Sequence, residues 1–190
     1  MTLPNKLTIS RLFLTAAFLA VFFARFQYSA TWALVLFSLG GLTDWLDGWL
    51  ARRAGSITAF GALMDPLADK ILICSGFIAL VERGLVPAWM AVIIVGREFA
   101  ITGLRLLAAS KQIVLSAEGF GKHKTIWQTV AIIALLTSVA HQEWGEWGSM
   151  LFGFWVDGFA QFAKWMAVVL TVISGLVYLS RNREIYLRDC

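Results

Sequence analysis

Charged residues are scarce in this chain: Asp, Glu, Lys and Arg together make up 15% of its 190 residues, whereas 59% are hydrophobic. Soluble globular domains carry about 25% charged residues, and a single core of this size cannot bury so large an apolar fraction. The mean hydropathy of +0.74 agrees with this excess. The composition therefore excludes an ordinary soluble enzyme and predicts an integral membrane protein in contact with membrane lipids.

Cysteine and histidine are also rare, with two residues of each. Cys74 lies in an apolar run and Cys190 is the last residue, so their spacing indicates neither a disulfide nor a metal cluster. His123 and His141 are isolated, and we expect both at solvent-exposed loop positions. The first residues contain a turn signal in place of a charged region with a cleavage site, so no removable signal peptide is expected.

Apolar runs close to the length that crosses a bilayer, about 20 residues, recur along the chain. They predict six transmembrane helices, at residues 9–26, 30–50, 57–81, 87–109, 126–140 and 159–178. The fifth run is short, and its helix could begin as early as Gly121. No repeat, low-complexity tract or linker separates the runs, which predicts one all-α membrane domain over residues 1–190.

Lys and Arg gather on one side of this helix plan, which indicates the cytoplasmic side. The basic side carries Lys6, Arg11, Arg52, Arg53, Lys111, Lys122, Lys124, Arg181, Arg183 and Arg188. The opposite side carries Arg25, Arg83 and Lys164, and its longest loop, 141–158, is acidic. Both termini are therefore expected in the cytoplasm. The net charge of +4 suits anionic head groups and phosphorylated substrates beside a membrane, and we expect no nucleic-acid partner.

Four aspartates lie inside the second and third predicted helices, where a carboxylate costs roughly 2.5–3.5 kcal/mol on insertion scales. One face of the second helix carries Asp44, Asp47, Gly48, Ala51 and Arg52, and one stripe of the third carries Gly61, Asp65 and Asp69. Because the two helices are antiparallel neighbours, we expect their carboxylates to converge at similar depth, open toward the cytoplasm.

Facing carboxylates repel one another unless protons or cations neutralise them. Oxygen ligands favour Mg²⁺ or Mn²⁺, or Ca²⁺, over zinc, and two such ions can clamp the attacking and leaving oxygens of a phosphoryl transfer. Two alternatives remain open. The acids could form packing ion pairs with Arg52, Lys70 or Arg97, which would explain one Asp better than four. They could also line a cation pathway of a divalent-cation transporter, which would not explain the small residues and Arg52 on the same face.

The stretch Asp44-x2-Asp47-Gly48-x2-Ala51-Arg52-x8-Gly61-x3-Asp65-x3-Asp69 resembles the signature of the CDP-alcohol phosphotransferase family at all eight fixed positions. The resemblance implies that family's six-helix fold and a two-metal site, with Mg²⁺ or Mn²⁺ held by Asp44, Asp47, Asp65 and Asp69. It also implies that Asp69 is the general base. The CDP-linked lipid would be held by Gly48, Ala51, Arg52, Gly61, Asn5 and Thr8.

Residues 4–11, 96–105 and 121–125 are similar to segments of the bacterial phosphatidylglycerophosphate synthases within this family. This resemblance implies transfer from CDP-diacylglycerol to glycerol 3-phosphate at the cytoplasmic face of a bacterial inner membrane, by a homodimer. The acceptor phosphate would be held by Arg97, Arg105, Lys122 and Lys124. The alternative is the same chemistry with inositol phosphate, serine or phosphatidylglycerol as acceptor. Arg97 could equally form an ion pair with Glu98, and the two lysines could be membrane anchors.

Overall fold

The structure is a computed structural model that describes residues 3–54, 59–111 and 120–183, with side chains described at 8–43, 64, 67–111 and 123–183. Its helices are α1 (Leu3–Ala24), α2 (Ser29–Ala54), α3 (Ala59–Glu82), α4 (Ala88–Ser110), α5 (Phe120–Ala140), the 3₁₀ helix η1 (His141–Trp144), α6 (Gly145–Phe152) and α7 (Val156–Arg181). The described residues contain no strand, which confirms the predicted all-α class.

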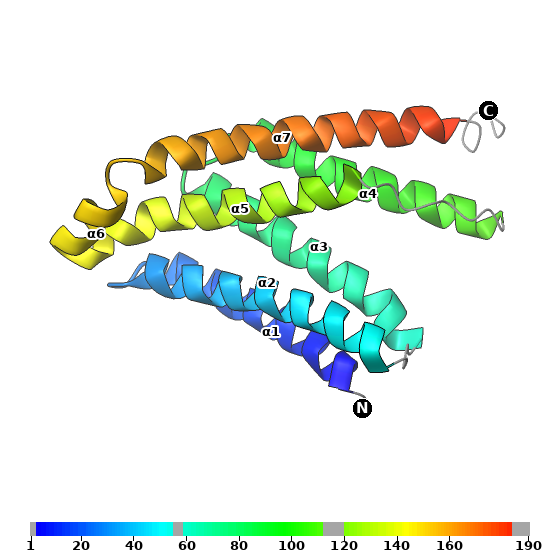
Figure 1. Ribbon diagram of the computed structural model, residues 1–190, viewed down its shortest axis with the longest axis horizontal. Helices are drawn as coiled ribbons and strands as arrows, with labels where there is room; N and C mark the ends of the chain where they lie inside the picture. Colours follow the sequence, from blue (N-terminus) through cyan, green and yellow to red (C-terminus); the bar gives the residue numbers. More distant parts are fainter. Residues whose placement is uncertain (1–2, 55–58, 112–119, 184–190) are drawn as a thin grey trace.

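The long helices run in alternating directions along one axis of the bundle (Figure 1). At a rise of about 1.5 Å per residue, even α5, with 21 residues, is long enough to cross a hydrocarbon core of about 30 Å. The start of α1 and the end of α7 lie at the same end of the bundle, and α6 lies at the opposite end. The prediction that both termini lie on the cytoplasmic side of a membrane stays a prediction.

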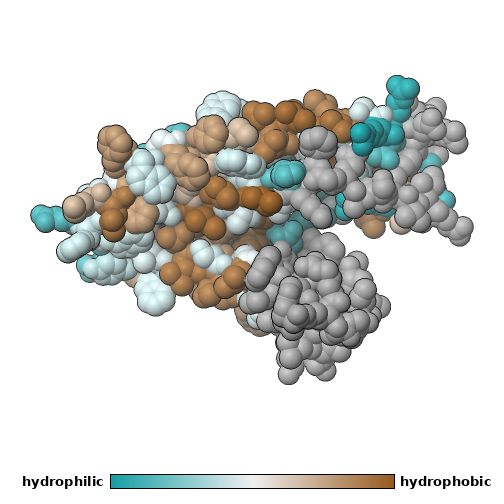
Figure 2. All heavy atoms as spheres, in the orientation of Figure 1, coloured by the Kyte–Doolittle hydropathy of each residue, from teal (hydrophilic) through white to brown (hydrophobic). Residues whose placement is uncertain are grey.

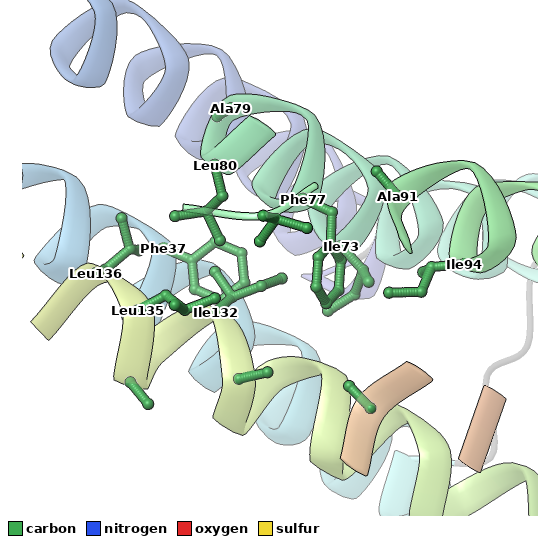
Figure 3. Packing of buried hydrophobic residues seen from close by; sticks show 14 of the residues in the cluster. Phe37, Ile73, Phe77, Ala79, Leu80, Ala91, Ile94, Ile132, Leu135 and Leu136 are labelled. Carbon is green, nitrogen blue, oxygen red and sulfur yellow. The ribbon is translucent and has the colours of Figure 1, made fainter. Parts of the chain in front are cut away.

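Aromatic and aliphatic side chains of α2, α3 and α5 form the centre of the core. Figure 3 shows Phe37, Phe77 and Ile132 gathered between these helices, and all three are fully buried. The helices approach closely at Gly76, where an added Cβ would lie 2.8 Å from Ile132 Cδ1 and 3.0 Å from Phe37 Cε2. A larger residue at position 76 would therefore require the fully buried side chains of Ile132 and Phe37 to shift, and closely packed protein interiors accommodate such shifts at a cost in stability.

Apolar side chains also cover the outside of the bundle, and Figure 2 shows them over the middle of one face. Phe13, Ile78, Val92 and Phe99 are each more than half exposed, as is expected of helices that contact lipid. Among the described residues, α7 alone is long and apolar enough to qualify as a membrane span by length and composition. The apolar segments Thr8–Ala24 and Ser29–Thr43 are shorter. Six membrane crossings therefore stay a prediction.

The structure decides several local predictions. The fifth helix begins at Phe120, one residue before the early start predicted at Gly121, and the predicted loop 141–158 contains η1 and α6. His141 is buried and not exposed, because η1 continues directly from α5 and places its Nδ1 3.2 Å from the carbonyl oxygen of Thr137. His123 is exposed, as predicted, but it lies in α5 and not in a loop.

Two basic residues that the sequence assigns to the cytoplasmic rim are buried. Arg11 is 0% exposed in α1, and Lys124 is 5% exposed in α5. The positive-inside rule counts residues near helix ends and does not detect which way their side chains point. A basic residue near a helix end can therefore belong to the interior of the bundle.

The 3₁₀ helix η1 is tied to the start of α2. One oxygen of Glu143 accepts a hydrogen bond from the backbone N–H of Ala30 at 2.9 Å, and the other accepts from the N–H and the hydroxyl of Thr31 at 2.9 and 2.6 Å. Trp144 Nε1 donates to the same hydroxyl at 2.8 Å. The first N–H groups of a helix have no partner within the helix, so Glu143 caps α2 from 113 positions further along the chain.

Candidate active site

The signature residues lie on the parts of α2 and α3 nearest their connection. Asp47 lies seven residues before the last residue of α2, and Asp65 lies six residues after the first residue of α3. At about 1.5 Å per residue, both positions are roughly 10 Å from the end of their helix. The backbone thus agrees with the similar depth predicted for the aspartates.

Asp69 alone among the four predicted metal ligands has a described side chain. The side chains of Asp44, Asp47, Asp65, Gly48, Ala51, Arg52, Gly61 and Asn5 lie outside the described set. The part of the chain with described side chains holds no cluster of three or more His, Cys, Asp or Glu. The two-metal assignment and most of the donor-binding assignment therefore stay predictions.

The surroundings of Asp69 link the signature to the predicted acceptor residues. Asp69 is half-buried on α3, and its charge interacts with those of Lys70 and Lys124.

Thr8, predicted to bind the donor, is fully buried on α1, which packs against both α2 and α3. Arg11 is buried one turn further along the same helix. Polar side chains of α1, α3 and α5 thus lie inside the part of the bundle that carries the signature.

A buried network of three charged residues joins α4 to α5. Oε1 of Glu98 lies 3.4 Å from Nη1 of Arg97 and forms a second ion pair with Nζ of Lys124. None of the three side chains is more than 13% exposed. The structure therefore confirms the predicted ion pair between Arg97 and Glu98. The burial of Lys124 contradicts its alternative interpretation as a surface anchor.

A second contact joins α3 to α4 beside this network. Nζ of Lys70 donates a hydrogen bond to Oγ1 of Thr102 at 2.5 Å, and the same hydroxyl donates to the carbonyl oxygen of Glu98 at 2.6 Å. Lys70 also interacts electrostatically with Arg97 and Arg105. The four cations Lys70, Arg97, Arg105 and Lys124 thus belong to one cluster built on three helices.

Helix α7 contacts two members of the cluster, Arg105 and Arg97. Arg105 Nε donates to the hydroxyl of Tyr178 at 3.3 Å, and its guanidinium carbon lies 5.6 Å from the centre of the Tyr178 ring. The Arg97 side chain passes over Gly175, where an added Cβ would lie 3.0 Å from Arg97 Cγ. Arg105 itself is exposed, so a ligand can reach it while Tyr178 holds its side chain. The side chain of Lys122 lies outside the described set.

In comparison with known proteins, residues 1–173 match the CDP-alcohol phosphatidyltransferase family. The chain belongs to this family. A relative from Bacillus subtilis (strain 168), named CDP-diacylglycerol--glycerol-3-phosphate 3-phosphatidyltransferase, is 38% identical over 96% of this chain and 95% of its own length. A Rickettsia felis protein of the same name is 30% identical over 97% of both chains. One from Wigglesworthia glossinidia brevipalpis is 36% identical over 72% of this chain and 77% of its own.

The sequence predicts only part of the cationic cluster of this CDP-alcohol phosphatidyltransferase. It predicts Arg97, Arg105 and Lys124 together, and the structure brings them together. From the sequence, Lys70 is assigned only to a possible ion pair with the aspartates, although it lies directly next to Asp69. Tyr178 lies 73 residues from Arg105, and no local pattern in the sequence connects the two.

Proposed function

We propose that this protein transfers the phosphatidyl group of CDP-diacylglycerol to glycerol 3-phosphate, which yields phosphatidylglycerophosphate and CMP. The observation that carries the proposal is the cationic cluster around Glu98, whose members Lys70 and Lys124 interact with the charge of Asp69. A phosphorylated acceptor must approach an anionic donor, so its site needs positive charge of its own. The relatives from B. subtilis and R. felis are named for this reaction, and they are similar to this chain over nearly their full lengths.

Asp69 is our candidate for the general base. Its carboxylate would accept the proton of the acceptor hydroxyl as that oxygen attacks the phosphorus that bears diacylglycerol. The bond from this phosphorus to the oxygen of CMP then breaks, and CMP leaves with the bonding electrons. Arg52 would bind the diphosphate of the donor, because a guanidinium is a permanent cation with a fork of donors that matches phosphate oxygens. Gly48 and Ala51 would leave room for the nucleotide.

Enzymes of this family in general depend on a divalent metal. Four carboxylates, on Asp44, Asp47, Asp65 and Asp69, would form an all-oxygen donor set of the kind that Mg²⁺ and Mn²⁺ prefer. When bound, such ions would neutralise charge on the transferred phosphate and on the departing CMP. Asp69 would serve both as a ligand and as the base.

An acceptor screen tests the proposed function. Purified protein with CDP-diacylglycerol and Mg²⁺ or Mn²⁺ is offered glycerol 3-phosphate, inositol 1-phosphate, serine or phosphatidylglycerol in turn. We expect phosphatidylglycerophosphate from glycerol 3-phosphate, because the cationic cluster favours a phosphorylated acceptor over serine. A faster reaction with another alcohol would keep the chemistry and change the acceptor. Absence of any CMP release would favour the remaining alternative, a divalent-cation transporter.

We further propose that the protein crosses a bacterial inner membrane six times, with both termini and the active site on the cytoplasmic side. The start of α1 and the end of α7 lie at the same end of the bundle, which supports this topology (Figure 1). In a Cys74→Ser background, a membrane-impermeant thiol reagent should label Cys190 only after spheroplasts are opened. Labelling in intact spheroplasts would invert the topology. The family resemblance also supports a homodimer, which light scattering of the purified protein would test.

A further inference from the structure

Lys70 is fixed to the part of α4 that carries the predicted acceptor residues. Its ammonium group donates to Thr102 Oγ1 at 2.5 Å, and Thr102 in turn donates to the carbonyl oxygen of Glu98. The side chain of Glu98 holds Arg97 and Lys124 through its two ion pairs. Glu98 thus contacts Arg97 and Lys124 through its carboxylate, and its carbonyl oxygen is linked to Lys70 through Thr102.

The cluster carries more positive than negative charge. Within the described part of the chain its cations are Lys70, Arg97, Arg105 and Lys124, and the carboxylates that act on them are Asp69 and Glu98. The four basic side chains thus outnumber the two carboxylates that act on them. Lys124 is buried and Lys70 and Arg97 are half-buried, and burial of like charges is costly unless an anion shares their site. A phosphate monoester, which carries about −1.5 to −2 at neutral pH, is an anion of this kind.

Lys70 has the chemistry to contact such an anion. An ammonium group has three N–H donors, and the bond to Thr102 uses one of them. The side chain is half-buried, so part of it remains accessible to a ligand. Asp69, the proposed base, is its neighbour in the chain. A phosphate held by Lys70 would therefore keep the acceptor hydroxyl near the base.

We propose that Lys70 binds the phosphate of the acceptor and that Thr102 positions it. This inference rests on the proposed function and adds to the acceptor site a residue of α3, the helix that also carries Asp65 and Asp69. The cations of α4 and α5 would then hold the phosphate from one side and Lys70 from the other. The acceptor would be anchored to the same helix as the base that deprotonates it.

The test is binding of radiolabelled glycerol 3-phosphate to the purified protein, together with kinetics at saturating CDP-diacylglycerol. Lys70→Met should weaken binding and raise the KM for glycerol 3-phosphate about ten-fold or more, because it removes a hydrogen bond from a charged donor. The KM for CDP-diacylglycerol should change less than about two-fold, since the lost contact belongs to the acceptor. Lys70→Arg keeps the charge and should retain binding within about three-fold. Thr102→Val keeps Lys70 and removes its anchor, so it should weaken binding about two- to five-fold.

Lys164 provides a matched control. It is a buried lysine on α7 that donates to the carbonyl oxygen of Leu85 at 3.2 Å, away from the cluster. Lys164→Met should leave binding of glycerol 3-phosphate unchanged even if it lowers stability. An equal loss of binding in both lysine variants would indicate a general effect of removing a buried charge and would overturn the proposal.

Other outcomes are equally decisive. Unchanged binding in Lys70→Met, or a rise in the KM for CDP-diacylglycerol of similar size, would overturn the assignment. If Lys70→Met does not fold, as judged by gel filtration, Thr102→Val decides, and unchanged binding there overturns the proposal. A wild-type protein that binds glycerol 3-phosphate but forms no phosphatidylglycerophosphate would overturn the proposed function, while the binding comparison would still decide the role of Lys70. A wild-type protein that does not bind it would overturn both.

Discussion

Replacing Glu143 with Ala should destabilise the protein by removing the cap of α2. The substitution deletes three hydrogen bonds, of 2.9, 2.9 and 2.6 Å, that the carboxylate accepts at the first turn of that helix. It leaves the N–H groups of Ala30 and Thr31 without this partner, and Ala30 is buried. It also removes a negative charge from the positive end of the helix dipole.

The size of the effect follows from these contacts. Loss of a helix cap costs about 0.5–2 kcal/mol, and hydrogen bonds to a charged group are worth about 1.5–3 kcal/mol each where water cannot replace them. Glu143 is half-buried, so water recovers part of this loss. We expect a net loss of about 2–4 kcal/mol for Glu143→Ala and about half of that for Glu143→Gln, which keeps one acceptor oxygen. In a protein of this length, 2–4 kcal/mol corresponds to a fall in Tm of roughly 4–16 °C.

Thermal unfolding of the purified protein in detergent, followed by tryptophan fluorescence, measures this change. Glu146→Ala is the matched control, because it removes an exposed carboxylate three residues further along and should leave Tm within about 1 °C, as surface substitutions usually do. Thr31→Val should lower Tm less than Glu143→Ala, and the double variant should fall short of the sum, because the two residues share a hydrogen bond. An unchanged Tm in Glu143→Ala, or an equal fall in Glu146→Ala, would refute the cap.

Three further predictions concern the site and the core. Asp69→Asn should lower turnover about 100-fold or more and leave CDP-lipid binding within a few fold, because it removes a base; equal losses in both assays would make Asp69 chiefly a metal ligand. Arg105→Gln should raise the KM for glycerol 3-phosphate about ten-fold and spare that for the lipid, whereas Tyr178→Phe, which keeps the ring beside Arg105, should have a smaller effect. Gly76→Ala should lower Tm, because its Cβ would meet a core side chain at 2.8 Å and overpacking costs about 1–3 kcal/mol. Gly103→Ala, with no atom within 4 Å of its Cβ, should raise Tm slightly, and the opposite order would contradict the packing argument.

The long helices could be predicted from the sequence because their apolar runs are long and separated by polar residues. Their packing partners could not. A helix that is apolar on every side gives no hydrophobic periodicity that indicates which face is buried. Ile78 is 55% exposed and Phe77, one position earlier, is 0% exposed, although both are large apolar residues of α3. The short helix α6 was missed for a different reason, since eight residues with two glycines give a weak helical signal.

Polar residues gave better guidance to the site, for a physical reason. Lipid cannot solvate a charge, so charged residues on membrane helices must meet one another, a ligand or water. This rule predicts that Arg97 and Lys124 meet a partner inside the bundle, as both do at Glu98, and it applies equally to Lys70, the neighbour of Asp69 in the chain. It does not apply to Glu143, because a carboxylate in a loop outside the apolar runs can remain in water. The cap of α2 depends on the path of the chain after α5, which brings η1 to Thr31. Such a contact requires the tertiary structure, whereas desolvation alone can indicate the contacts of an intramembrane charge.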